Sequence, residues 1–548
     1  IKNILSPEKN LLIYAAIYGI IISLLSLAIP VLIQLLINSV LFTAILQPII
    51  ILGVILLILL TLSGVFNSIQ FYVAEIFQRK IFARLASEIS LKLLYADHRS
   101  FQESNQTELT NRFFDVITVQ KTIPKFLTKT FTVILQSILG LILISCYHPI
   151  LLLFSLLIVI AIYFICKIYI KNAIISSFFE SRKKYDLAGW LEDIARNNVI
   201  FKSEVGQNYA KYKIDFITNQ YLKERKKHFK SLFSQNILLL ALYAIASSAL
   251  LMLGGYLVLK SQLTLGQLVA SELVLSSILY GISRLGSDFE SFYDMVGACE
   301  KLTNFYNIPL NEKRGEILDA DKINIKFDNV KESSFGKDYI FNFEFKSGKN
   351  YLLATKHSST QKLIIELING LHLPQSGNIE FNEINIENLD CFDLRSKISI
   401  IDNSQLLEGT IEEYLTFHDQ KITRKQVNEI LKITGLDLVI SRFEEGLSTR
   451  IIPSGWPFSE SEKILLKTAR TLLLQPKIII ITEIFDILSL KMRKKIMNYL
   501  TKEHYSTIIC FSNRRDEIDE FDSYGFINYE KMINFSSIKD LQEFEQNL

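Results

Sequence analysis

The chain has 548 residues, of which 49% are hydrophobic and only 21% are charged. A mean hydropathy of +0.26 is too high for an ordinary soluble enzyme, because so few charged residues cannot cover a water-exposed surface. The net charge of +3 gives no basis for nucleic-acid binding. We expect neither a disulfide framework nor a metal site, because the five cysteines are scattered, with no CxxC pair and no histidine at zinc spacing. They are Cys146, Cys166, Cys299, Cys391 and Cys510.

Three long uncharged runs dominate the first half of the chain. Residues 10–74 form a run of 65, which is too long for one membrane span of about 20 residues and fits two with a turn. Residues 130–166 and 231–259 are also uncharged. The alternative, buried helices of a soluble protein, is disfavoured because such cores rarely run this far without a charge. The sequence predicts six spans, at about 11–38, 46–74, 127–146, 149–170, 231–259 and 265–284.

The connections between these spans predict their orientation. Connections 75–129 and 167–230 hold 9 and 14 Lys and Arg residues, whereas the three short connections hold one, Lys260. By the positive-inside rule, the long connections and both termini are cytoplasmic, in a multi-pass protein of the cytoplasmic (inner) membrane. The long connections also have helical periodicity. We therefore expect helical legs that continue roughly 40 Å beyond the membrane.

The pattern changes after about Glu316, where short apolar runs alternate with helical segments. Residues 478–481 are four consecutive isoleucines, which is typical of a parallel strand buried on both faces. Such alternation predicts an α/β domain with a largely parallel sheet. We assign residues 1–302 to a membrane domain, 303–322 to a linker and 323–548 to the α/β domain.

This arrangement resembles an ABC exporter half-transporter, closest to the type I secretion and bacteriocin-exporter kind. The segment from Gly254 to Ala270 is similar to the family's link between spans five and six, and the start from Leu5 to Pro30 is also similar. The resemblance implies a six-helix transmembrane bundle with long cytoplasmic legs, followed by an α/β ABC-ATPase-like domain. It implies a dimer in the lipid bilayer with itself or a related half, other envelope export proteins as partners, and no nucleic acid. The residues matching its coupling tip are Phe101, Glu108, Arg112 and Asp115.

The nucleotide-binding loop of the family is altered in this chain. A working P-loop needs glycines so that backbone N–H groups wrap phosphates, a Lys for the phosphate oxygens and a hydroxyl for magnesium. Thr355, Ser358 and Thr360 stand at the glycine positions, and Gln361 stands at the Lys position. A shift of one place would use Lys362, but Leu363 would then replace the hydroxyl. The loop comprises Thr355, Lys356, His357, Ser358, Ser359, Thr360, Gln361 and Lys362.

The other ATPase motifs differ as well. The resemblance places Asp402 at the Q-loop glutamine, Thr482 at the magnesium-orienting Asp and Asn513 at the switch His. The signature loop reads Phe458, Ser459, Glu460, Ser461, Glu462. We expect its two acids to point where a partner's γ-phosphate would arrive. One such loss is compatible with activity, but five favour a domain without ATP hydrolysis. ATP and magnesium, the family's cofactors, are therefore not expected to bind well, and Glu483 at the general-base position is interpreted as vestigial.

One carboxylate falls within a predicted span. Glu272 lies six residues past Gly266, about 9 Å from the outer end of span six. An intramembrane carboxylate usually faces a cavity or a partner; the alternative is a position at the headgroup level.

These features favour a catalytically degenerate ABC-exporter-like protein that acts as a structural or regulatory subunit of an export or envelope complex. One alternative is half of an ATP-driven exporter of peptides or proteins. Another is a membrane carrier of an N-terminal peptidase-like domain, because the first residue is Ile and we expect a further segment upstream.

Overall fold

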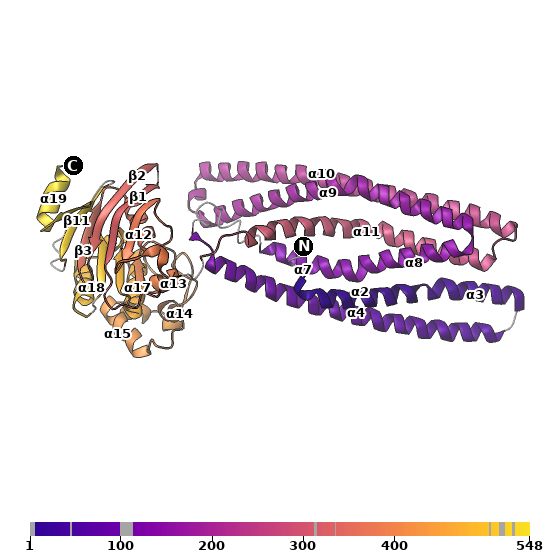
Figure 1. Ribbon diagram of the computed structural model, residues 1–548, viewed down its shortest axis with the longest axis horizontal. Coiled ribbons are helices and arrows are strands. Elements are labelled where there is room, and N and C mark those ends of the chain that lie inside the picture. The colour runs from indigo at the N-terminus through magenta and orange to yellow at the C-terminus, as the bar shows by residue number, and fades with distance from the viewer. Residues whose placement is uncertain are drawn as a thin grey trace. The chain divides into compact units, whose positions relative to one another are not determined.

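The computed structural model describes residues 6–43, 46–98, 113–311, 315–334, 336–503, 506–514, 521–528 and 532–547. They form two compact units (Figure 1): the first holds the described residues up to Ala96 and from 113 to Leu310, and the second holds those from Asn311 onward together with Asp97 and His98. The first unit is helical and the second contains the β-sheets. The predicted order, a helical bundle followed by an α/β domain, is therefore confirmed.

The first unit consists of long helices. They are η1 (Ser6–Glu8), α2 (Lys9–Ser26), α3 (Ala28–Thr43), α4 (Leu46–Tyr95), α7 (Phe114–Lys125), η2 (Phe126–Thr130), α8 (Phe131–Tyr147), α9 (Pro149–Arg196), η3 (Ile200–Lys202), α10 (Glu204–Leu259) and α11 (Leu265–Tyr306). Among the described residues, five helical segments are long and apolar enough to cross a membrane. The start of α11, Leu265–Ile278, is a shorter apolar stretch. The predicted span 265–284 lies within α11, which continues through Tyr306 into the predicted linker.

In α4, α9 and α10 the legs are continuous with the spans, because neither Gly nor Pro lies at the change between apolar and charged sequence. Before α8, Pro124 and the π-helical η2 stand at this change. The 56 residues of α10 extend about 84 Å at 1.5 Å per residue, far more than the roughly 30 Å hydrocarbon core of a bilayer. Ser203 caps this helix by accepting a hydrogen bond from the backbone N–H of Gly206 (3.1 Å). The two basic connections predict such helices, which are longer than the membrane is thick.

Close helix packing in the outer part of the bundle depends on Gly140 of α8. A Cβ atom at this position would lie 2.7 Å from Cγ1 of Val274 and 2.8 Å from Cδ1 of Ile278, both on α11. Only glycine allows the two helices to approach this closely. The surrounding core of Ile144, Leu250 and Leu275 is buried.

The second unit combines strands with short helices. They are β1 (Ile325–Ser334), β2 (Lys337–Phe345), β3 (Asn350–Thr355), α12 (Ser358–Ile368), β4 (Ser376–Phe381), β5 (Ile384–Asn385), η4 (Ile386–Asn388), α13 (Cys391–Ser396), β6 (Ile398–Ile401), β7 (Gly409–Thr410), α14 (Ile411–Thr416), α15 (Arg424–Thr434), α16 (Asp437–Ile440), η5 (Gly446–Ser448), β8 (Arg450–Ile451), α17 (Glu460–Leu474), β9 (Ile478–Ile481), η6 (Glu483–Ile487), α18 (Leu490–Glu503), β10 (Thr507–Phe511), β11 (Ser523–Ile527), β12 (Met532–Phe535) and α19 (Ile538–Gln546).

A six-stranded sheet forms the core of this unit, in the order β12-β11-β3-β10-β9-β6. Every pairing except β11 with β12 is parallel. All four residues of β9 are buried, as the run of isoleucines predicts. A separate antiparallel sheet has the order β2-β1-β4-β5. Because neighbouring strands are parallel, the carboxyl ends of β3, β10, β9 and β6 meet at one edge of the sheet.

Candidate functional site

The candidate site lies at this carboxyl edge, in the segments that follow four neighbouring strands. The P-loop position follows β3, and Asp402 follows β6. Thr482 and Glu483 follow β9, and Asn513 lies two residues after β10. The fold therefore gathers four of the five altered motifs at one edge of the sheet, where ligands bind in open α/β sheets.

The P-loop position has a tight connection into a helix. Strand β3 ends at Thr355 and α12 begins at Ser358. The backbone N–H of Thr360 donates to the carbonyl oxygen of His357 (3.1 Å), so the first helical turn is already closed there. None of residues 355–362, all of which the structure describes, has a positive φ. The chain therefore avoids the conformations that glycine would supply, and the threonines and serine cost no backbone strain.

Two side chains of the first turn of α12 point into the domain interior, whereas Lys356, His357 and Ser358 are exposed. Thr360 and Gln361 are 1% and 5% exposed. Neither Oγ1 of Thr360 nor Oε1 of Gln361 has a hydrogen-bond partner among the described residues. Lys362 is exposed, and its Nζ lies 3.7 Å from Oε1 of Glu366, one turn further along the same helix.

At the Q-loop position, a buried lysine donates hydrogen bonds to the loop. Nζ of Lys467, on α17, donates to the carbonyl oxygen of Asp402 (2.6 Å) and to the carbonyl and hydroxyl oxygens of Ser404. It also lies 3.5 Å from Oδ1 of Asp402. Burial lowers the pKa of the Lys467 ammonium. A cavity of about 400 Å³ beside this contact is lined by Asp402, Ser404, Lys463 and Lys467, among others.

Replacing Lys467 tests how strongly this contact holds the Q-loop position to α17. Lys467→Met retains the aliphatic stem and leaves two backbone carbonyls of the loop without their donor. We expect a loss of about 1–3 kcal/mol in the free energy that holds this loop closed, because unsatisfied polar groups cost that much. Hydrogen–deuterium exchange over residues 402–406 measures the change. Lys463→Met on the same helix is the matched control, and equal exchange in both variants would contradict the assignment.

The general-base and switch positions contact each other. Nδ2 of Asn513 donates to Oε2 of Glu483 (2.9 Å). Thr482, at the magnesium position, is buried, and its hydroxyl donates to the carbonyl oxygen of Ile401 (2.9 Å). The Thr482 side chain is thus occupied with the neighbouring strand, while Glu483 is paired with an amide.

Asp486 is the centre of a hydrogen-bond network at the same edge. Its carboxylate accepts from the hydroxyl of Ser512 (2.7 Å) and from the backbone N–H groups of Asn513 (2.8 Å) and Arg514 (3.3 Å). Nη1 of the buried Arg493 lies 3.5 Å from Oδ1 of Asp486. Asp486 therefore fixes the segment that carries the switch position.

Both acids of the signature loop have partners within the unit. Oε2 of Glu462 accepts from the backbone N–H and hydroxyl of Ser459 (2.8 and 2.7 Å), which completes a capping box at the start of α17. Glu460 pairs with Lys463 (2.8 Å). Phe458 is buried against Phe443, and Ser461 lies in the first turn of α17. That these acids lie where a partner's γ-phosphate would arrive stays a prediction.

Two sets of predicted residues lie in or next to the helical unit. Phe101, Glu108 and Arg112 of the coupling tip lie outside the described residues. Asp115 is buried, with Oδ2 3.9 Å from Nζ of Lys301. In α11, Oε1 of Glu272 accepts from the hydroxyl of Ser276 (3.2 Å), while its Oε2 is buried without a hydrogen-bond partner in the described part of the chain.

Sequence reasoning missed the roles of Lys467 and Asp486. The sequence does carry a signal for the role of Lys467, because this charged residue interrupts the apolar face of α17 between Ile464 and Thr468. The capping box had one too, in the spacing of Ser459 and Glu462. Asp486 had none, because the groups that donate hydrogen bonds to it in the segment after β10, Ser512 and Asn513, lie more than 25 residues away in sequence.

Comparison with known proteins shows which families this chain is similar to. Residues 12–283 match the family model of the ABC transporter transmembrane region. The chain is 28% identical over 247 residues to the uncharacterized ABC transporter ATP-binding protein YknV of Bacillus subtilis (44% of this chain, 41% of the relative). It is 24% identical over 335 residues to the putative export ATP-binding/permease protein RC1073 of Rickettsia conorii (59% and 57%).

A third relative is the alpha-hemolysin translocation ATP-binding protein HlyB of Escherichia coli O157:H7, 23% identical over 258 residues (46% of this chain, 36% of the relative). The chain spans about half the length of the curated relatives it matches. Its fold is similar to a bacterial Atm1-family ABC exporter solved with ATP bound, with a TM-score of 0.87, 16% identity, and coverage of 98% of this chain and 96% of that one. Residues 12–283 are thus an ABC transporter transmembrane region, and the chain is an ABC exporter-like membrane protein with an Atm1-family exporter fold.

Proposed function

We propose that this chain is a catalytically degenerate ABC-exporter-like subunit, with a structural or regulatory role in an export or envelope complex. The observation that carries the proposal is that side chains at the altered positions are used inside the domain. Thr482 bonds to the neighbouring strand, Asn513 bonds to Glu483, and Glu462 caps its own helix. These three side chains therefore have hydrogen-bond partners inside the domain, and none of them depends on a nucleotide for one.

The residues at the P-loop position do not fit a magnesium nucleotide. Gln361 supplies no cation, and it is buried rather than directed into a phosphate-binding loop. The N–H of Thr360 is taken by His357, whereas phosphate binding requires free N–H groups around a wide loop. Thr482 carries no carboxylate to orient magnesium. We therefore assign no catalytic step to this site.

Membrane placement follows from the same proposal. We place the chain in the cytoplasmic membrane with both termini inside, as a dimer with itself or a related ABC half, because exporters of this fold usually act as dimers in the bilayer. The type I secretion kind remains a proposal that rests on the sequence resemblance and on the match to HlyB.

Cysteine labelling in intact cells tests the orientation. In a cysteine-free background, Ser261→Cys in the short turn after α10 is expected to react with a membrane-impermeant maleimide. Lys539→Cys near the C-terminus should react only after permeabilisation. Both positions are exposed in their own units, so the membrane alone decides the result. The reverse pattern would overturn the proposed topology.

The proposed structural or regulatory role can be tested on the complex purified under mild conditions. Its composition identifies the partners, and its ATPase activity is measured before and after Gln361→Lys, Thr360→Gly and Thr482→Asp are combined. We expect no activity from sites that contain the unmodified chain, and wild-type cellular function without repair. ATP turnover that disappears when Glu483→Gln is introduced into the unmodified chain would contradict the proposal.

One observation favours the second candidate function, half of an ATP-driven exporter. A carboxylate, Glu483, is still present at the general-base position, directly after Thr482 and strand β9. In that case, an intact ABC half should copurify, and mutation of its own P-loop should abolish export.

A further inference from the structure

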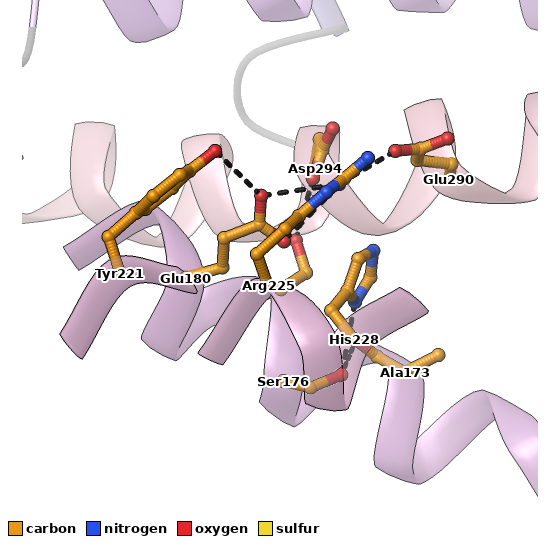
Figure 2. A network of polar contacts seen from close by, with 9 residues as sticks. Ala173, Ser176, Glu180, Tyr221, Arg225, His228, Glu290 and Asp294 are labelled. Atoms are coloured by element: carbon orange, nitrogen blue, oxygen red, sulfur yellow. Dashed lines mark hydrogen bonds and ion pairs between the residues drawn. The ribbon is translucent and has the colours of Figure 1, made fainter. Parts of the chain in front are cut away.

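A polar network marks the face of α10 that packs against its neighbouring helices (Figure 2). Nη1 of Arg225 contacts Oε1 of Glu180 on α9 (3.2 Å) and Oε1 of Glu290 on α11 (2.9 Å). Nδ1 of His228 lies 3.0 Å from the hydroxyl oxygen of Ser176 on α9. Because Arg225 and His228 are three residues apart, both lie on the same side of α10. This side faces the bundle.

The opposite side of α10 carries a row of exposed side chains. Lys226 and Lys230 lie two residues before and after His228, about 160° around the helix from it at 3.6 residues per turn. Phe233 and Ile237 continue the row, at spacings of three and then four residues. Both lysines are exposed, and Phe233 and Ile237 are 52% and 47% exposed. We call these four residues the outer row.

The two lysines of the outer row are not used within the chain. Neither ammonium group has a hydrogen bond or an ion pair among the described residues. Glu224, an acid close to them in sequence, is paired with Lys227, whose Nζ lies 2.6 Å from its Oε1. Lys226 and Lys230 are one helical turn apart, so both ammonium groups can reach a single anion.

The register of α9 and α10 places the outer row at the edge of the membrane. On α10, the uncharged run begins at residue 231, inside the row. The two helices are antiparallel, and the contact between Ser176 and His228 fixes their register. Lys171, five residues before Ser176, therefore lies level with Phe233, five residues after His228. Both helices thus become charged near the same level, which marks the inner edge of the hydrocarbon core.

The order of side chains along the outer row matches a phospholipid with a negatively charged headgroup. Two cations lie on the headgroup side, and an aromatic ring and an aliphatic side chain follow toward the hydrocarbon. The rings of Phe229 and Phe233 are stacked, with centroids 5.5 Å apart, and add an apolar surface beside the lysines.

Other occupants of the outer row fit less well. A free phosphate or an acidic peptide would pair with the lysines but would leave Phe233 and Ile237 uncovered. The same row of a second copy, related by a two-fold axis along the membrane normal, would bring lysine against lysine, and like charges repel.

We propose that the outer row is a binding site for an anionic phospholipid. Its phosphate lies between the ammonium groups of Lys226 and Lys230, and an acyl chain lies along Phe233 and Ile237. Such a lipid ties α10 to the membrane surface at the level where the leg begins. The proposal goes beyond the structural or regulatory role and rests only on the membrane placement, which the cysteine labelling tests separately.

Photo-cross-linking of the full chain in lipid nanodiscs identifies what covers the outer row. Ile237 is replaced by p-benzoylphenylalanine, and the nanodiscs contain phosphatidylcholine with a minor share of phosphatidylglycerol. Mass spectrometry of the cross-linked peptide gives the ratio of the two lipids at this position. We expect phosphatidylglycerol to be enriched about tenfold or more over its share in the nanodisc, because each lysine near an anionic lipid contributes roughly fivefold.

Matched variants show whether the lysines cause this enrichment. Lys226→Gln with Lys230→Gln should return the lipid ratio to that of the nanodisc, while total cross-linking to lipid stays unchanged and shows that the chain is inserted. Lys202→Gln with Lys211→Gln removes the same charge at exposed positions roughly 25 Å or more along the leg, and it should keep the enrichment. A wild-type ratio equal to that of the nanodisc, an unchanged ratio in the first variant, or cross-links from position 237 to protein instead of lipid would overturn the proposal.

Discussion

Calorimetric titration of the purified full-length chain with millimolar Mg-ATP is expected to give no binding isotherm. Three contacts to charged groups are missing: the cation at Gln361, the carboxylate at Thr482 and the N–H groups of a glycine-rich loop. Each such contact contributes about 1.5–3 kcal/mol. A combined loss of about 4.5 kcal/mol or more weakens binding by roughly a thousandfold, at tenfold per 1.4 kcal/mol.

Stepwise repair makes this measurement discriminating. Gln361→Lys alone is expected not to restore binding, because α12 begins at Ser358 and the N–H of Thr360 already bonds to His357. Binding requires glycine at Thr360 as well, so that the helix start can open into a loop. A dissociation constant below about 100 µM for the unmodified chain would show that this turn binds phosphate by other means, and the structural role would then lose its main support.

The architecture could be predicted from sequence because it depends on local patterns. A run of 65 uncharged residues has no soluble explanation, and four consecutive isoleucines suit only a strand covered on both sides. The motif positions came from the resemblance to ABC exporters. Four of them lie close together because a parallel sheet brings the ends of neighbouring strands to one edge.

What the altered side chains do instead could not be predicted in the same way. Lys467 reaches Asp402 across 65 residues, and Arg225 joins Glu180 to Glu290 across three helices. Such contacts depend on the relative rotation and register of helices, which periodicity leaves open. The capping box of Glu462, by contrast, can be predicted from the local spacing of Ser459 and Glu462.

The second large effect is expected from removing Asp486, the centre of the hydrogen-bond network at the carboxyl edge of the sheet. Asp486→Ala removes the acceptor for Ser512, Asn513 and Arg514 and leaves the buried Arg493 guanidinium without this counter-ion. Burial already lowers the pKa of Arg493, which shows that its charge is costly to bury. Removing one partner of a buried ion pair typically costs about 3–5 kcal/mol, far more than the loss of any exposed pair.

Hydrogen–deuterium exchange of the full chain in detergent measures this cost at β9 and β10, the strands whose ends Asp486 joins. An opening made easier by about 3–5 kcal/mol speeds exchange by roughly 10²–10³-fold, at tenfold per 1.4 kcal/mol. Asp486→Asn keeps the shape of the side chain and one acceptor oxygen. Its exchange rate at β9 and β10 should therefore lie between those of the wild type and Asp486→Ala. Asp540→Ala is the matched control, because the Asp540 carboxylate also accepts a hydrogen bond from a nearby serine, Ser536 (2.8 Å), but is exposed. If Asp486→Ala and Asp540→Ala exchange at the same rate in β9, the carboxylate at 486 does not hold this edge of the sheet together. If only Asp486→Ala speeds exchange in β9 and β10, the hydrogen-bond network of Asp486 holds this edge of the sheet rigid.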